Sequence, residues 1–286
     1  MKDKELAALV KLLEDNDEEV FKVVTQKIIE KGVEAIVTLE KAWEKSLNNV
    51  VQSRIENLIQ EIQFNNIKTE LRDWTDKGGE NLLYGAFIIA KYQYPDLNYE
   101  EIEQKIEILR KDAWLEMNEN LTALEKIRVV NHVMFALHKF TGNTSNFYSP
   151  VNSYINQVLE TKKGNPISLA IIYSSISQKL GLPVYGVNLP LNYILAYQDL
   201  SYGEDADGIL FYINPYNRGT VLNKKEIEYF LSEQKLELQS DFFKPCSNIT
   251  TIERILRNLY FSFEKLGYEE KSKQISYLLD IINSKA

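Results

Sequence analysis

The stretch that decides the fold begins Gly164-Asn165-Pro166-Ile167-Ser168-Leu169 and ends Leu180-Gly181-Leu182-Pro183. Asn165 is a favourable N-cap, because its side-chain oxygen can accept a hydrogen bond from an early helical amide. Pro166 suits the first helical position, where the backbone nitrogen needs no partner. Gly181, with Pro183 two residues later, is typical of a helix end. Since most side chains between these signals are apolar, the sequence predicts a buried helix over residues 166–180.

Three short runs rich in β-branched and aromatic residues follow this helix, at residues 184–188, 192–198 and 209–214. A proline at position 190 and an acidic, glycine-containing loop at 201–208 separate them. Such runs between turn residues are typical of strands in an antiparallel sheet. We expect the three strands to pack on the predicted helix.

The rest of the chain has helical periodicity. Residues 4–64 carry apolar side chains at the spacing of four amphipathic helices, which pair as two hairpins and resemble one or two HEAT-type units. A module of this kind either binds a protein partner on its concave face or caps the core domain, and both alternatives stay open. Three more helical stretches precede residue 140, and a helical hairpin turning at Gly267 ends the chain.

These patterns predict an α+β protein that is mostly helical. We expect a HEAT-like helical domain over residues 1–70, a helix-on-antiparallel-sheet domain over residues 71–240, and a C-terminal helical hairpin over residues 241–286.

Composition narrows the functional classes. The chain has 286 residues, a formal net charge of -8 and one cysteine, Cys246. The single cysteine rules out intramolecular disulfides, and the absence of a signal peptide or long apolar segment favours the cytoplasm. Scattered Lys and Arg residues disfavour nucleic acid and membranes as partners. His132 and His138 lie six residues apart, which disfavours a shared metal site on a helix, and no motif calls for a cofactor.

Four phrases in the middle of the chain are similar to those of the bacterial SirB-type transglutaminase-like family. They read NSYINQVL, KKGNPISLAIIY, LGLPVYGVNLP and INPYNRG, in that order, and the similarity covers roughly residues 80–235. The resemblance implies a transglutaminase and papain-like core. It also implies that the C-terminal hairpin is a tetratricopeptide-like pair, since relatives carry similar helices there.

The resemblance locates the catalytic positions, and all three carry other side chains. The family's nucleophilic cysteine belongs at or next to Pro166. Its histidine, in a Pro-Gly-His-Phe phrase, corresponds to Asn192, and its aspartate, in an Asp-Pro phrase, corresponds to Asn214. Proline offers no nucleophile, and an asparagine amide takes up no proton at neutral pH. We therefore expect no Cys-His-Asp catalysis.

Two interpretations of these positions stay open. They line a vestigial groove that has been reused for binding, with Asn165, Ser168, Tyr193 and Tyr216 as further candidate groove residues, or they are ordinary cap and turn residues. The first predicts a protein-interaction or regulatory module with a protein or peptide partner. The alternatives are an amide-processing enzyme, of protease, transglutaminase or deamidase type, with a non-standard catalytic set, and a purely structural scaffold.

Overall fold

The computed structural model describes residues 2–15, 17–199 and 208–284. The chain divides into two compact units, Met1–Arg72 and Asp73–Ala286. The predicted three-domain division, with its boundaries after residues 70 and 240, stays a prediction. None of the described helices is both long enough and apolar enough to cross a bilayer.

The first unit is entirely helical. Its helices are α1 (Lys2–Lys11), α2 (Glu18–Glu30), α3 (Ile36–Lys45) and α4 (Asn49–Asp76), the last of which continues into the second unit. Asp17 caps α2 by accepting hydrogen bonds from the amides of Glu19 and Val20. The amphipathic spacing seen in the sequence forms one core, in which Leu13, Ile28 and Leu39 are fully buried.

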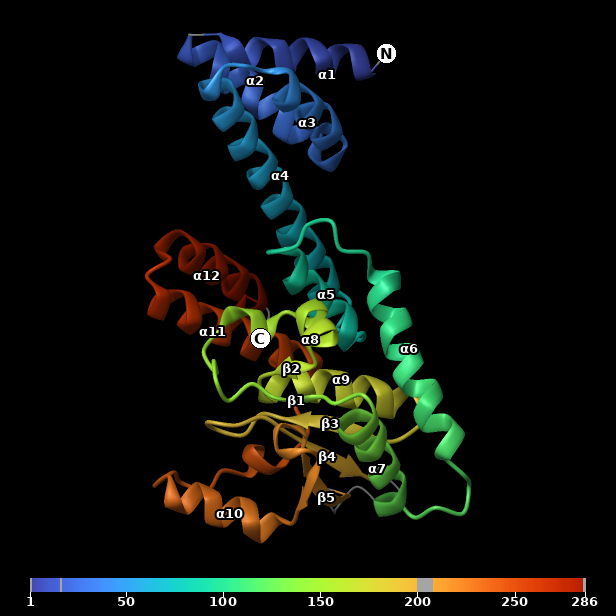
Figure 1. The fold of residues 1–286 in the computed structure, drawn as a ribbon. Helices are drawn as coiled ribbons and strands as arrows, with labels where there is room; N and C mark the ends of the chain where they lie inside the picture. The colour runs from blue at the N-terminus through green and yellow to red at the C-terminus, as the bar shows by residue number, and fades with distance from the viewer. Residues whose placement is uncertain (1, 16, 200–207, 285–286) are drawn as a thin grey trace. The chain divides into compact units, whose positions relative to one another are not determined.

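The second unit combines helices with a small sheet (Figure 1). The helices are α5 (Leu82–Lys91), α6 (Tyr99–Glu116), α7 (Ala123–Asn131), α8 (Ile155–Thr161), α9 (Pro166–Lys179), α10 (Lys224–Glu233), α11 (Asn248–Leu266) and α12 (Glu269–Asn283). The strands are β1 (Thr141–Gly142), β2 (Lys163–Gly164), β3 (Val184–Val187), β4 (Ile194–Gln198), β5 (Ile209–Asn214) and β6 (Thr220–Leu222). The chain is therefore α+β and mostly helical, as predicted.

The four-stranded sheet has the order β3-β4-β5-β6, with every neighbouring pair antiparallel. Helix α9 contacts β3 and β4, while Ile227 and Leu231 of α10 join a core with Val187, Ile194 and Tyr212 of the sheet. Figure 1 shows α9 and α10 on opposite sides of the sheet. Burial on both faces explains why β4 is a continuous apolar run rather than an alternating one. The predicted helix at 166–180 and its antiparallel strands are confirmed.

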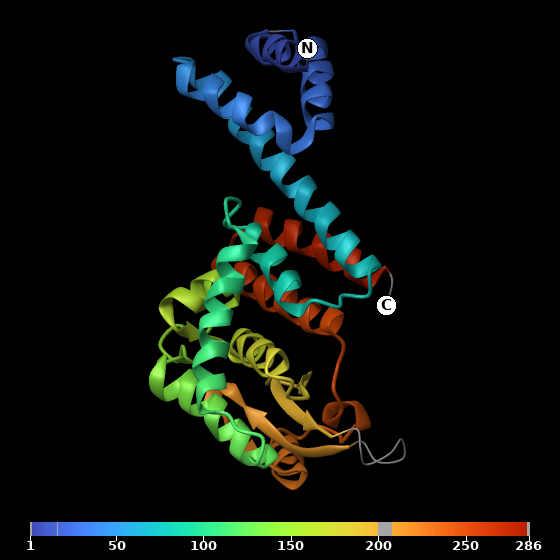
Figure 2. The same ribbon diagram turned by 90° about the vertical axis from the view of Figure 1, so that its right-hand side faces the viewer.

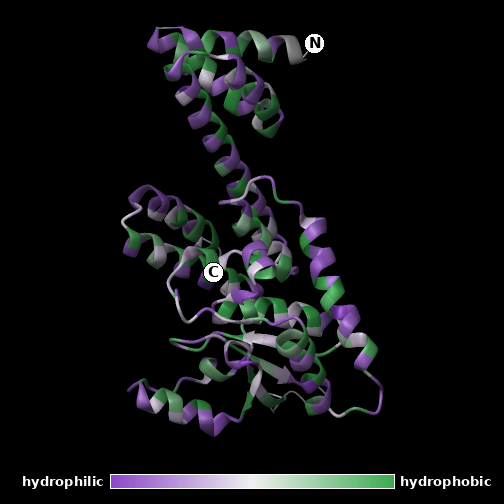
Figure 3. Ribbon diagram, in the orientation of Figure 1, coloured by the Kyte–Doolittle hydropathy of each residue, from purple (hydrophilic) through white to green (hydrophobic). Residues whose placement is uncertain are grey.

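Helix α9 is the buried centre of this unit. Residues 167–177 are all buried, and Figure 3 shows α9 hydrophobic along most of its length, whereas α6 alternates between hydrophobic and hydrophilic residues. Helices α11 and α12 form the predicted C-terminal hairpin and lie side by side in both views (Figures 1 and 2). Gly267 ends α11 with a φ of 75°, a left-handed conformation that glycine adopts without steric cost.

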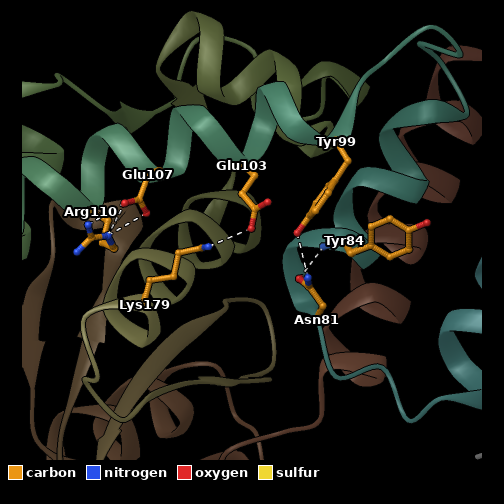
Figure 4. Close-up of polar contacts among 7 residues, drawn as sticks. All are labelled: Asn81, Tyr84, Tyr99, Glu103, Glu107, Arg110 and Lys179. Atoms are coloured by element: carbon orange, nitrogen blue, oxygen red, sulfur yellow. Dashed lines mark hydrogen bonds and ion pairs between the residues drawn. The ribbon is translucent and has the colours of Figure 1, made fainter.

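Polar contacts hold α6 in place (Figure 4). Asn81 caps α5 by accepting from the Tyr84 amide at 3.0 Å, and its Nδ2 donates to the Tyr99 hydroxyl at 3.0 Å, joining the starts of α5 and α6. Lys179 at the end of α9 pairs with Glu103 of α6 at 3.1 Å. These contacts join α6 to the start of α5 and to the end of α9.

The last of the three helical stretches predicted before residue 140 is not one continuous α-helix. Helix α7 ends at Asn131, and the chain continues as a π-helix over His132–Leu137. His138 follows it, and its Nε2 lies 2.6 Å from Oδ2 of Asp112 on α6. Among the described residues, no three His, Cys, Asp or Glu side chains gather in metal-binding geometry.

Candidate functional site

A pocket of about 220 Å³ opens at the start of α9. Four segments of the second unit form it: the loop before α8, the first turn of α9, the β3–β4 turn, and one face of α11. The residues that line it are Phe147, Tyr148, Ser149, Ser153, Asn165, Pro166, Ile167, Leu191, Asn192, Tyr193, Arg254, Asn258, Phe261 and Ser262. The exposed aromatic side chains of this set, Phe147, Tyr148 and Phe261, form a rim.

A closed hydrogen-bond network builds the start of α9. Asn165 Oδ1 accepts from the Ser168 amide at 2.9 Å, while the Asn165 amide donates to Ser168 Oγ at 3.1 Å. Asn165 Nδ2 also donates to Ser153 Oγ at 3.0 Å, which ties the helix to the preceding loop. Ser168 is only 1% exposed and lies behind the pocket, where its side chain belongs to the helix cap.

Steric contacts explain why a glycine, Gly164, lies two residues before α9. A Cβ at Gly164 would lie 2.6 Å from Ser168 Oγ and 2.9 Å from a methyl carbon of Val158. Neither neighbour has room to move, because both are buried. Gly164 therefore keeps the chain close enough to α9 for Pro166 to begin the helix at the pocket wall.

The β3–β4 turn brings Asn192 to the pocket. Leu191, just before it, has a φ of 61° and is 67% exposed, so a leucine occupies a left-handed position that normally favours glycine. The resemblance aligns this position with the glycine of the Pro-Gly-His-Phe phrase. Asn192 Oδ1 accepts from the adjacent Tyr193 amide at 2.8 Å, which leaves its Nδ2 donors for the pocket.

Tyr193 is buried beneath the pocket. Its hydroxyl lies 2.7 Å from Thr251 Oγ1 and 3.4 Å from the Cys246 sulfur, and burial raises the pKa of the phenol well above its ordinary value. The Cys246 amide donates to the Gly186 carbonyl at 2.8 Å, so this segment is held against β3. Cys246 itself does not line the pocket.

Asn214 lies at the same end of the sheet as Asn192, because Leu195 of β4 pairs with Ile213 of β5. Its side chain is engaged locally, where Oδ1 accepts from the Asn217 amide at 3.3 Å, and it is not part of the pocket lining. Tyr216 also stands outside the lining, with its ring centroid 6.0 Å from that of Phe147. The structure thus brings Pro166, Asn192, Asn165 and Tyr193 to one pocket, whereas Asn214, Tyr216 and Ser168 are not among its lining residues.

Arg254 is one of the lining residues that the sequence did not predict. It is the one charged side chain among the described residues that line the pocket, and burial lowers the pKa of its guanidinium. Its Nη1 donates to Asn188 Oδ1 at 3.2 Å, a neutral acceptor. A signal was present: Arg254, Asn258 and Phe261 share the helical face of α11 that faces away from its apolar stripe.

The side chains that line this pocket can bind a ligand. Neither cysteine nor histidine is among the described residues that line it, so the lining has no thiolate nucleophile and no imidazole base. It has hydroxyl and amide groups, one guanidinium and an aromatic rim. These groups recognise a ligand through hydrogen bonds, charge and stacking.

Comparisons with known proteins give the family. The family model described as the transglutaminase-like superfamily matches residues 100–257, more than half of the chain. The chain belongs to this superfamily, and the matched residues include every residue that lines the pocket except Asn258, Phe261 and Ser262 of α11.

The chain is similar in sequence to bacterial UPF0162 proteins and to a mammalian F-box only protein. A UPF0162 protein of Xylella fastidiosa is 34% identical over 189 residues, and the match covers 63% of this chain and 63% of the relative. A UPF0162 protein of Vibrio cholerae is 24% identical over 178 residues, or 61% of this chain and 63% of the relative. F-box only protein 21 of Mus musculus is 25% identical over 238 residues, which are 75% of this chain and 36% of that protein. No solved structure matches the chain.

Proposed function

We propose that this member of the transglutaminase-like superfamily is a non-enzymatic interaction or regulatory protein, and that the pocket at the start of α9 binds a polypeptide. The observation that carries the proposal is a pocket with an aromatic rim at the helix start, lined by Pro166 and Asn192 where the resemblance implies a nucleophile and a base. Aromatic and arginine side chains are the residues that contribute most to protein recognition.

The wall of the pocket supports this function. Asn165 and Ser153 are hydrogen-bonded to each other, and Tyr193 is bonded to Thr251, so the cavity is formed before a ligand enters. A preformed cavity lowers the entropy that binding must overcome. The mouse relative is an F-box only protein by name, which is consistent with a role in protein interactions.

Finer assignments belong to the same proposal. We assign the chain to the SirB type within the superfamily, on the four phrases quoted above. The first unit is a HEAT-like helical module, and α11 with α12 is a tetratricopeptide-like hairpin. Residues 1–70, 71–240 and 241–286 are the corresponding domains. The protein acts in the cytoplasm without a cofactor.

Two measurements test the proposal. The full chain is assayed for amide hydrolysis, deamidation and transamidation on a dye-labelled casein and on glutamine peptides, with an active transglutaminase as positive control. We expect no turnover. In parallel, binding to an array of random-sequence peptides is compared between the wild type and Asn192→Trp, which fills the pocket, with Tyr229→Trp on exposed α10 as a matched control.

The outcomes separate the alternatives. Loss of peptide binding in Asn192→Trp, with binding unchanged in Tyr229→Trp, supports the pocket as the binding site. Turnover by the wild type that Asn192→Trp abolishes would favour an amide-processing enzyme with a different catalytic set. An unchanged peptide profile in a folded Asn192→Trp protein would leave only the scaffold function.

A further inference from the structure

Arg254 is a cation with no carboxylate partner among the residues that the structure describes. Its side chain is half-buried in the pocket, and the hydrogen-bond partner that the structure gives it is the neutral Asn188 amide oxygen at 3.2 Å. Arg257, one turn away, differs: it lies exposed and pairs with Glu253 at 2.6 Å. Removing a guanidinium from water without an opposite charge is unfavourable, so an unpaired cation in a cavity indicates an anionic ligand.

The neighbouring polar groups favour the same kind of ligand. Asn192 uses its side-chain oxygen to accept from the Tyr193 amide, which leaves its Nδ2 as a donor to the pocket. Asn258 lies one helical turn beyond Arg254 on the same face of α11, and both residues line the pocket. No aspartate or glutamate is among the described residues that line the pocket. The cavity therefore offers donors and one positive charge.

The single positive charge in the pocket favours a carboxylate over a phosphate as the ligand. One guanidinium matches the single charge of a carboxylate and its planar pair of oxygens. Phosphate groups carry more charge and are usually bound by clusters of basic side chains. A second cation, Lys265, lies on the ring of Tyr148 at 3.6 Å, outside the lining residues. It adds to the positive potential at the rim without entering the cavity.

Depth and size indicate how the carboxylate arrives. Leu191 and Phe261 at the opening are 67% and 66% exposed, whereas Arg254 is half-buried, so the charge lies inside and the apolar surface outside. The volume of about 220 Å³ is below the roughly 300–1,000 Å³ of small-molecule sites. A chain end entering the pocket fits this arrangement, because its carboxylate reaches the interior while the preceding side chains lie on the aromatic rim.

We propose that the pocket binds the free C-terminal carboxylate of a polypeptide, with Arg254 as the charge partner and Asn192 and Asn258 as additional donors. This inference rests on the proposed function, since it specifies which part of a peptide the pocket recognises. Recognition of a terminal carboxylate is a known mode of peptide binding.

The test uses the full-length protein and pairs of otherwise identical peptides. Random-sequence hexapeptides with an N-terminal fluorophore are prepared as free acids and as carboxamides, and binding is measured by fluorescence polarisation at low and high salt. Because a hydrogen-bonded charge contributes about 1.5–3 kcal/mol, we expect the free acids to bind about 10- to 100-fold more tightly. Added salt should weaken the binding of the free acids more than the binding of the carboxamides, because salt screens the attraction between charges.

Variants assign the effect to the guanidinium. Arg254→Gln removes the charge and leaves a shorter amide that can still donate a hydrogen bond, and it is expected to abolish the preference for free acids. Arg254→Lys keeps the charge and retains part of the preference. Arg257→Gln, on the same helix, is the matched control and leaves the preference unchanged. Circular dichroism checks that each variant is folded. The comparison of free acids with carboxamides on the wild-type protein tests carboxylate recognition even if a variant fails to fold.

Three results would overturn the inference. Equal binding of free acids and amides would reject carboxylate recognition while leaving peptide binding intact. Arg254-dependent binding of amidated peptides that carry an internal glutamate or aspartate would replace the chain end with an acidic side chain. Absence of binding by every peptide in either form would reject both this inference and the proposed function.

Discussion

Substituting Gly186 by alanine tests how the pocket floor is built. Gly186 lies on β3, and a Cβ at this position would be 1.9 Å from the Tyr193 hydroxyl oxygen and 2.8 Å from the ring carbon that carries it. Tyr193 is 2% exposed and its hydroxyl lies 2.7 Å from Thr251 Oγ1. The ring therefore moves only if that hydrogen bond breaks.

The expected cost follows from two terms. Overpacking a well-filled core costs about 1–3 kcal/mol, and losing a buried hydrogen bond costs about 0.5–1.5 kcal/mol. We expect Gly186→Ala to lower the free energy of unfolding of the second unit by about 2–4 kcal/mol. Backbone strain contributes nothing, because Gly186 is not among the glycines with positive φ.

A double-mutant cycle measures the coupling. Urea unfolding is followed by hydrogen exchange of β3 and β4 amides in wild type, Gly186→Ala, Tyr193→Phe and the double variant. Because Tyr193→Phe removes the atom in closest contact, Gly186→Ala should cost about 1–2 kcal/mol less in that background. Tyr185→Phe, on the same strand and exposed, is the control for the loss of a hydroxyl. An equal cost of Gly186→Ala in both backgrounds would refute the steric argument.

Three further predictions concern local structure. Leu191→Gly should raise the free energy of unfolding by about 0.5–1 kcal/mol in urea denaturation, because the left-handed penalty of leucine exceeds the added flexibility of glycine. Gly219→Ala should lower it by at least about 2 kcal/mol in the same assay, since its φ is 73° and the new Cβ would lie 1.9 Å from Asn131 Oδ1. Hydrogen bonds from Thr122 lower the pKa of the Glu125 carboxyl in the folded state, so its contribution is present at neutral pH and lost as the pH falls through that titration. Thermal unfolding of wild type and Glu125→Gln should therefore differ most at neutral pH and converge in acid.

The secondary structure that positions the pocket could be predicted because its signals are local. Asn165 and Pro166 begin α9 and the left-handed Gly181 follows its end, so cap chemistry alone located the helix. Strand β6 was not predicted. It has three residues and follows the left-handed pair Arg218 and Gly219, so the run is too short to show a period of two.

The π-helix at His132–Leu137 was also missed, because its apolar spacing does not differ from that of an α-helix over so few residues. The only lining residues that the sequence predicted are those that belong to a recognisable motif. Arg254 and Phe261 lie far along the chain from Asn165, and helical periodicity shows which face of α11 is polar but not what that face approaches. Tertiary packing decides that Arg254 faces the start of α9.

The pocket keeps its shape through contacts that do not involve a catalytic triad. Asn165 bonds to Ser153 at one wall, Tyr193 to Thr251 at the floor, and Arg254 to Asn188 at the side, and each contact joins segments distant in sequence. The cavity therefore forms although the three positions that the resemblance assigns to catalysis carry other side chains. Since contacts at other residues hold the lining in place, the proposed binding of an anion at Arg254 requires neither a nucleophile nor a base at these three positions.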